Sequence, residues 1–141
     1  PFWFGDSAHR MLEIPATTGY SGHLHRMGRS LFPKIRTPAF QSIRLAGIAS
    51  RLGLLERIQL TPEEYTADEL IGLTDCMLKQ GVQVFGLTYH SPSLVPGNTP
   101  FVKSEAQLKE FLNTLKVYLS HFSRQFGGVF LSPPKLYETL K

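Results

Sequence analysis

The most continuous apolar run in the chain, VQVFGLTY, spans residues 82–89 and leads through His90 into a polar loop rich in proline and glycine. Apolar side chains at nearly every position are typical of a strand that is buried on both faces, as in a parallel sheet. His90 is the first residue beyond the apolar part of this run, so we expect it at the carboxyl end of a strand. In β/α folds, ligands bind and chemistry takes place at that end of the sheet.

Three further apolar segments predict strands, at residues 12–17, 54–60 and 129–131. Pro15 is expected at an end or a bulge of the first strand, because proline cannot donate a hydrogen bond to a sheet ladder. Residues 18–38 carry three glycines and two prolines. We interpret them as a long excursion loop with one helical turn near residues 27–31, and loops of this length are usually functional.

Helical periodicity and capping signals place helices between these strands. The segments TADE at residues 66–69 and SEAQ at residues 104–107 match the capping box, in which the N-cap side chain and residue N3 exchange hydrogen bonds. The first of these helices is expected to end near residue 80, before a glycine, and the second carries the longest apolar stripe. Further helices are predicted over residues 37–52 and from Pro133 to the C-terminus.

Strands and helices therefore alternate along the chain, and no two-residue hairpin turn joins consecutive strands. This order is typical of a parallel sheet covered by helices, so the predicted fold class is α/β. The 141 residues have the usual size of one domain, and residues 1–141 are expected to form a single domain. Four βα units are half of a closed TIM-like barrel of about 250 residues, so we expect either an open sheet or half of a distorted (β/α) barrel.

Composition narrows the class of protein. Apolar residues make up 42% of the chain and charged residues 18%, the profile of a folded domain. No apolar run reaches about 18 residues, so we expect no membrane span and no membrane partner. The N-terminus lacks the regions of a signal peptide, which favours a cytoplasmic location. It also lacks an initiator methionine, so either that residue was removed or the chain is a piece of a longer protein.

Fifteen Lys and Arg residues against eleven Asp and Glu residues give a net charge of +4. The early basic residues have few acidic neighbours; they are Arg26, Arg29, Lys34, Arg36, Arg44 and Arg51. Such a segment attracts an anionic partner, forms a solvated face or meets an acidic neighbour. A nucleic-acid partner is not expected, because the chain has no basic block, RNP-like motif or zinc-finger spacing. The single Cys76 excludes an internal disulfide and a cysteine-rich metal site.

Four segments together carry a family resemblance: FWFG near the N-terminus, LEIPATTGYSG, LTYHSPSLVPGNTPFVKSEAQLKEFLNTL and FGGVFLSPPKLYETL. In this combination the chain resembles the C-terminal half of a polysaccharide deacetylase of the NodB-homology type, and in particular the WalW-like branch. The resemblance covers nearly the whole chain. The HSPSL–PGNTP loop is its most specific part, followed by the LEIPATTG segment.

The resemblance implies a distorted (β/α) barrel that hydrolyses N- or O-acetyl groups of a glycan. In that family, a divalent metal, zinc in our expectation, is held by an aspartate and an HxxxH pair, and a second aspartate acts as base. This chain contains no TxDD motif and no two histidines four residues apart. The resemblance therefore implies no metal ligand in this chain and a zinc ion in the full enzyme. The LxxH sequence at residues 87–90 resembles the family's last motif, which is normally one residue shorter.

The histidine of that motif protonates the departing amine, so His90 is the expected catalytic residue. Histidine holds and releases a proton near neutral pH because its ordinary pKa is about 6.5. Tyr89 and Ser91, on either side of His90, and Trp3 in the N-terminal aromatic cluster are expected to bind substrate. For Trp3, the alternative is a place in the core or at an interface. The expected partners are an acetylated glycan and either the N-terminal half of the same protein or a second copy of this chain. The alternative function is a non-catalytic glycan-binding or assembly module.

Other polar residues have simpler interpretations. The pair His23 and His25 would need a third ligand to bind a metal ion, and no carboxylate is close in sequence. A solvated loop is the favoured interpretation of this pair. Ser93, in the loop after the apolar run, either orients the ring of His90 or caps the turn, and capping is favoured.

Overall fold

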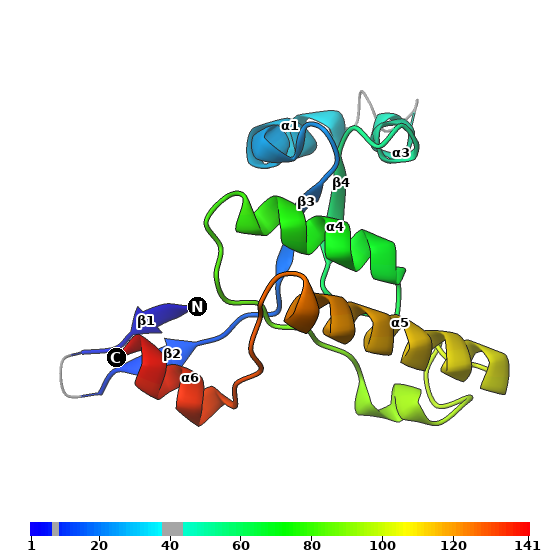
Figure 1. Ribbon diagram of the computed structural model, residues 1–141. Helices are drawn as coiled ribbons and strands as arrows, with labels where there is room; N and C mark the ends of the chain where they lie inside the picture. The colour runs from blue at the N-terminus through cyan, green and yellow to red at the C-terminus, as the bar shows by residue number, and fades with distance from the viewer. Residues whose placement is uncertain (7–8, 38–43) are drawn as a thin grey trace.

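The computed structural model describes residues 1–6, 9–37 and 44–141 and has an α+β fold in these residues (Figure 1). One antiparallel sheet pairs β1 (Phe2–Phe4) with β2 (Met11–Glu13), and a second pairs β3 (Thr18–Ser21) with β4 (Glu56–Gln59). The α-helices are α1 (Gly28–Ile35), α3 (Leu45–Arg51), α4 (Ala67–Leu78), α5 (Glu105–Arg124) and α6 (Pro133–Leu140). Two short 3₁₀ turns are η1 (His25–Met27) and η2 (Ser91–Leu94).

The predicted parallel sheet, and with it the half of a (β/α) barrel, is wrong. Both strand pairs are antiparallel, and the central pair aligns Thr18 with Gln59 and Ser21 with Glu56. The connection between β3 and β4 contains α1 and α3, which lie beyond the strand ends instead of across the sheet (Figure 1). A helix that crosses a sheet face returns the chain for a parallel strand, whereas a connection at the strand ends returns it antiparallel.

Two predicted strands are absent from the residues that the structure describes. Residues 82–90 run without strand pairing and are fixed to the rest of the fold by isolated backbone bonds. The amide of Thr17 donates to the carbonyl of Gly86 (3.0 Å), and the amide of Thr88 donates to the carbonyl of Leu60 (3.1 Å). Residues 129–131 are exposed and form no strand. An apolar run predicts burial, but a strand also requires a neighbour that forms a continuous ladder.

The helices predicted from capping boxes are confirmed. Before α4, Oγ1 of Thr66 accepts from the amide of Glu69 (3.4 Å), and Oε2 of Glu69 accepts from the amide of Thr66 (2.7 Å). Before α5, Oγ of Ser104 accepts from the amide of Gln107 (3.3 Å). The reciprocal bond differs there, because Oε1 of Gln107 accepts from the amide of Lys103 (2.7 Å). Each cap satisfies amide groups that the first helical turn leaves without partners.

The remaining predictions are confirmed in part. The strand expected at residues 54–60 corresponds to β4, and the final helix corresponds to α6. The strand expected at residues 12–17 is replaced by β2 and β3, which lie on either side of Pro15. The loop expected at residues 18–38 begins with β3 and contains η1 and α1, so only its helical turn was predicted correctly. The helix expected at residues 37–52 is present as α3, while residues 38–43 lie outside the described residues.

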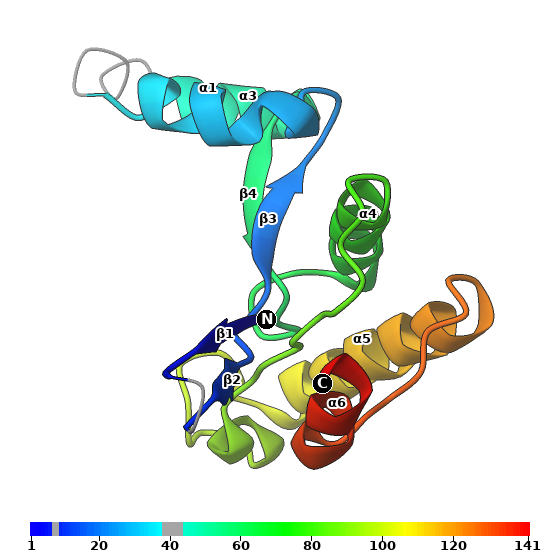
Figure 2. The same cartoon turned by 90° about the vertical axis from the view of Figure 1, so that its left-hand side faces the viewer.

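The core lies between the β3–β4 pair, α4 and α5 (Figure 2). Ile58 on β4, Leu70 and Leu73 on α4, and Tyr118 on α5 are buried in it. Gly19 on β3 allows α4 to approach closely, because a Cβ atom at this position would lie 2.8 Å from the Leu73 side chain. Burial of apolar surface at about 25 cal/mol per Å² is the main force that holds these elements together.

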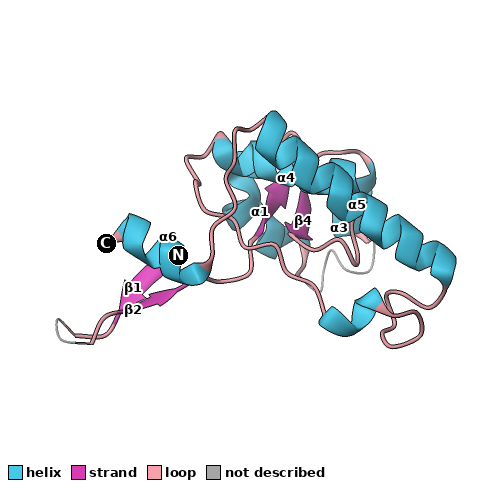
Figure 3. Cartoon of the chain, turned by 60° about the horizontal axis from the view of Figure 1, so that its bottom comes forward, coloured by secondary structure: helices cyan, strands magenta, loops and turns pink. Residues whose placement is uncertain are grey.

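A smaller unit consists of β1, β2 and α6, which lie apart from the core (Figure 3). The rings of Trp3 on β1 and Tyr137 on α6 meet edge-on, with centroids 5.1 Å apart. The guanidinium of Arg10 lies 4.6 Å from the centroid of the Trp3 ring. The aromatic contact therefore links the two ends of the chain, and the cation–π contact holds the Trp3 ring from the N-terminal side. Among the described residues, no helix combines the length and the apolar character that a membrane span requires.

Candidate active site

Two loops distant in sequence meet beyond the end of β4. The carbonyl of Leu60, the residue after β4, accepts the hydrogen bond from the amide of Thr88 described above. The chain continues from Leu60 through a turn to Glu63, and from Thr88 directly to His90. This single backbone bond therefore sets two polar side chains from different loops beside each other.

The carboxylate of Glu63 binds His90 at two points. Oε2 lies 2.8 Å from Nδ1 of the His90 ring, and Oε1 accepts from the His90 amide at 3.1 Å. The side chain of Glu63 is only 3% exposed, whereas that of His90 is 67% exposed. An ionised carboxylate accepts hydrogen bonds but cannot donate them, so Nδ1 carries the proton of this bond. The second ring nitrogen, Nε2, is then available on the exposed ring for proton exchange.

A chain of hydroxyl groups supports the carboxylate from behind. Oγ of Ser93, a fully buried residue, donates to Oε1 of Glu63 in a short hydrogen bond. Since Ser93 has one hydroxyl proton, Oγ1 of Thr99 must donate to Ser93 (2.9 Å). Oγ1 of Thr99 in turn accepts from the amide of Val102 (3.3 Å). Each hydrogen bond in this series is donated in the direction of the Glu63 carboxylate, which favours the negative charge of that carboxylate.

The pKa of the Glu63 carboxyl reflects these opposing effects. Burial raises the pKa, while hydrogen bonds from Ser93, from the His90 ring and from the His90 amide lower it, as does the charge of His90. The net result is a pKa below the ordinary value for glutamate. Glu63 is therefore ionised at neutral pH, the state that accepts all of these bonds.

An aromatic side chain fixes the orientation of the histidine ring. The rings of His90 and Phe101 are stacked, with centroids 5.7 Å apart and an interplanar angle of 15°. The ring of His90 is thus held by Glu63 at its edge and by Phe101 at one face. Such a ring loses less conformational freedom when it transfers a proton to or from a bound molecule.

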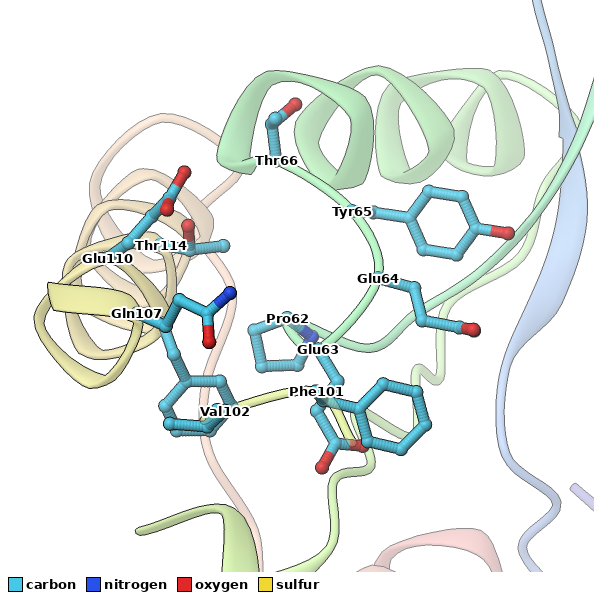
Figure 4. Close-up of a pocket in the computed structure, with 11 residues that line it drawn as sticks. Pro62, Glu63, Glu64, Tyr65, Thr66, Phe101, Val102, Gln107, Glu110 and Thr114 are labelled. Carbon is cyan, nitrogen blue, oxygen red and sulfur yellow. The ribbon is translucent and has the colours of Figure 1, made fainter. Parts of the chain in front are cut away.

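Glu63 and Phe101 also line a cleft between the segment before α4 and the α5 helix (Figure 4). The cleft has a volume of about 190 Å³. Figure 4 shows Gln107, Glu110 and Thr114 on the α5 side, facing the segment that carries Glu63. Carboxylate, amide and hydroxyl groups beside an aromatic ring are suited to a ligand rich in hydroxyl or amino groups.

The structure separates the predicted site residues. Tyr89 and Ser91 flank His90, and the Tyr89 ring rests edge-on against Phe111, with centroids 5.5 Å apart. Ser91 is exposed at the start of η2. Trp3 is not close to this site, because Figure 1 shows β1 and the lime-green η2 turn on opposite sides of the molecule. The prediction that Trp3 and His90 contact the same ligand therefore lacks support from the geometry.

Glu63 was missed by the sequence analysis, and Ser93 was assigned a different role. Glu63 closely follows the strand predicted at residues 54–60, so its position after a strand was the available signal. Ser93 neither caps a helix nor contacts the His90 ring, and its hydroxyl binds the carboxylate that orients the ring. Its burial between two other polar groups could not be inferred from local sequence.

In the described part of the chain, no three His, Cys, Asp or Glu side chains lie close enough together to hold a metal ion. Nδ1 of His25 is instead bonded to the carbonyl of Gly22 (2.9 Å), and His23 is exposed. Burial, and to a smaller extent the charge of Asp75, raise the pKa of the Cys76 thiol. A protonated thiol is a poor metal ligand and a poor nucleophile.

Comparison of the chain with protein-family models, with curated proteins and with solved structures found no match. The class of site is therefore defined by its own geometry. It is a carboxylate–histidine pair, in which a buried, ionised carboxylate orients an exposed imidazole. Glu63 and Phe101, the two residues that hold this ring, line the polar cleft, whereas His90 does not. Pairs of this kind serve general acid–base catalysis.

Proposed function

We propose that this chain is part of a glycan deacetylase, in which His90 is the general acid and Glu63 positions it. The observation that carries the proposal is the contact of His90 with one buried carboxylate, at 2.8 Å from the ring and 3.1 Å from the amide. The segments that resemble a NodB-type deacetylase supply the substrate class, an acetylated sugar. The polar cleft beside Phe101 supports a ligand of that chemistry.

The chemical role of His90 follows from the leaving group. When an acetamide is hydrolysed, water adds to the acetyl carbon and the bond from carbon to nitrogen breaks. The departing nitrogen must receive a proton, because an amide anion is too basic to leave in water. In the protonated state, Nε2 of His90 donates that proton, and the carboxylate of Glu63 stabilises the positive ring before transfer. The products are acetate and a free amino sugar.

The zinc ion expected in the full enzyme takes no part in the role proposed for this chain. No suitable group of ligands occurs among the residues that the structure describes, and no step of the proposal passes through a metal held here. We propose that its ligands are supplied from outside residues 1–141. The task of this chain is then to hold, orient and exchange a proton at His90.

Acetate release tests the proposal. The longest gene product that contains this chain is purified with zinc and incubated with an acetylated chitooligosaccharide, beside the variant His90→Ala and the matched control His23→Ala. His23 is another exposed histidine but lies outside the site. We expect acetate release that is lost in His90→Ala and retained in His23→Ala. Glycan binding without acetate release from any of the three proteins would instead support the alternative function, a non-catalytic glycan-binding module.

A further inference from the structure

The part of the molecule formed by η1, α1 and α3 has an unusual charge. Residues 14–55 contain no Asp or Glu but six Arg and Lys residues, and the remaining nine basic residues of the chain are outnumbered by the eleven acidic ones. Arg26, Arg29, Lys34 and Arg51 are exposed, and within the described ranges none of these four forms a salt bridge. The excess positive charge of the protein is therefore carried by the segment that contains η1, α1 and α3.

Exposed apolar side chains gather in the same segment. The amide of His23 donates to the carbonyl of Gly53 (3.0 Å), and the amide of Leu24 donates to the carbonyl of Leu54 (2.8 Å), so the start of η1 lies against the end of α3. Four large apolar residues in these two segments are exposed: Leu24 at 36%, Met27 at 55%, Leu52 at 63% and Leu54 at 37%. Arg26 and Arg51 belong to the same two segments. We call these six residues the basic–apolar patch.

The basic–apolar patch and the candidate active site lie at opposite ends of the β3–β4 pair. Ser21 and Glu56 pair at the end next to the helices α1 and α3, whereas Gln59 leads toward Glu63 at the other end. Figures 1 and 2 show α1 and α3 side by side beyond the strand ends, away from α5 and α6. The patch is therefore a separate surface that the proposed deacetylase chemistry does not use.

We propose that the basic–apolar patch binds the surface of a membrane that contains anionic lipids. Arginine side chains are attracted by anionic headgroups, and leucine and methionine side chains reach the boundary of the acyl chains. A nucleic acid or an anionic polysaccharide would engage Arg26 and Arg51 but would leave the four apolar side chains in water. The sequence argument against a membrane partner concerned a span, whereas surface binding requires only exposed basic and apolar residues.

Vesicle sedimentation with the whole 141-residue chain tests this inference. We expect binding to vesicles of phosphatidylcholine mixed with phosphatidylglycerol, weakened by salt, and no binding to phosphatidylcholine alone. The double variant Arg26→Gln, Arg51→Gln should bind about thirtyfold more weakly, because each basic residue near an anionic surface contributes about a fivefold gain in binding. The double variant Met27→Ser, Leu52→Ser should also lose vesicle binding, since it removes exposed apolar area.

The matched control is Lys109→Gln, Lys116→Gln, which removes two exposed charges from α5 and should leave vesicle binding unchanged. Circular dichroism of each variant shows whether it is folded, and all substituted positions are exposed. The proposal is overturned if the mixed vesicles do not bind the chain, or if the α5 control loses as much affinity as the patch variants. It is also overturned if heparin or duplex DNA binds while vesicles do not, because that outcome assigns the patch to a soluble polyanion.

Discussion

The hydroxyl group of Tyr118 on α5 lies 3.0 Å from Oγ1 of Thr74 on α4, between two helices that are 44 residues apart at this point. Oγ1 of Thr74 also lies 2.9 Å from the carbonyl of Leu70, to which it donates its only proton. Tyr118 is therefore the donor of the bond between the helices. Thr74 is fully buried and Tyr118 is 2% exposed, so the Tyr118 hydroxyl depends on Thr74 as its acceptor, whereas the Thr74 hydroxyl also has Leu70 as a partner.

The first prediction concerns the stability of this contact. Tyr118→Phe should lower the free energy of unfolding by about 1 kcal/mol, because it removes a donor and leaves Thr74 bonded to Leu70. Thr74→Val should cost more, about 1–3 kcal/mol, because the buried Tyr118 hydroxyl then has no acceptor. Urea denaturation measures both values. The double variant should be no less stable than Thr74→Val alone, and a cost equal to the two single losses added together would contradict a hydrogen bond between the two hydroxyl groups.

The second prediction follows from the lowered pKa of Glu63. A carboxyl whose pKa is lower in the folded state than in the unfolded state stabilises the fold at any pH above its pKa in the unfolded state. That contribution to stability is lost as the pH falls through the pKa of the carboxyl in the folded state. Glu63→Gln should therefore be less stable than the natural protein at neutral pH, and the difference should shrink on acidification to about pH 3. Urea denaturation over a pH series provides the measurement, and a difference that stays constant with pH would refute the role of the charge.

A third prediction isolates the support given by Ser93. Ser93→Ala removes a donor to Glu63 and leaves the hydroxyl of Thr99 without its acceptor. The expected cost is about 1–3 kcal/mol of unfolding free energy, and the pKa of Glu63 should rise relative to the natural protein. Carbon-detected NMR titration of the Glu63 carboxyl measures the second effect. The matched control is Ser91→Ala, an exposed position in the same turn, which should change neither quantity.

A fourth prediction separates catalysis from positioning in the zinc-loaded gene product that contains this chain. His90→Ala should lower kcat by about 10²-fold or more, the usual scale for a lost general acid, with metal content unchanged. Glu63→Gln should lower kcat by a smaller factor with little effect on KM, because the acid remains but its orientation and charge partner are lost. Steady-state acetate release supplies both constants. Loss of bound metal in His90→Ala would mean that this residue is a ligand and that its assignment as acid is wrong.

The last prediction concerns association. Val129 is 72% exposed and Phe130 is 60% exposed, in a segment without strand pairing, and Phe2 and Phe4 on β1 are also exposed. Apolar surface of this kind favours contact with another chain. We expect a dimer by light scattering at micromolar concentration, or a complex when the other half of the protein is supplied. Val129→Asp should abolish association, whereas Val117→Asp on α5 should not. A monomer of 15.9 kDa that persists when the other half is supplied would refute the prediction.

Local sequence determined the helices α4 and α5, whereas α1 was predicted only as one turn within a loop. The bonds that start α4 join Thr66 and Glu69 within one helical turn, and the apolar stripes of α4 and α5 repeat at the spacing of a helix. Such contacts depend only on neighbours in the chain, so patterns in the sequence predict them. His90 was correctly placed at the start of a loop because the apolar run before it ends visibly in the sequence, but the strand predicted for that run is absent.

Only the tertiary structure decided the strand pairing and the carboxylate partner of His90. Whether β4 runs parallel or antiparallel to β3 depends on where α1 and α3 lie, and no local pattern encodes that position. Residues 82–90 have the composition of a strand but lack a ladder partner, which only the packing of other segments could provide. Glu63 and His90 are 27 residues apart and meet because the amide of Thr88 bonds the carbonyl of Leu60. Local order follows from contacts within a few residues, whereas the fold and the site depend on contacts between segments distant along the chain.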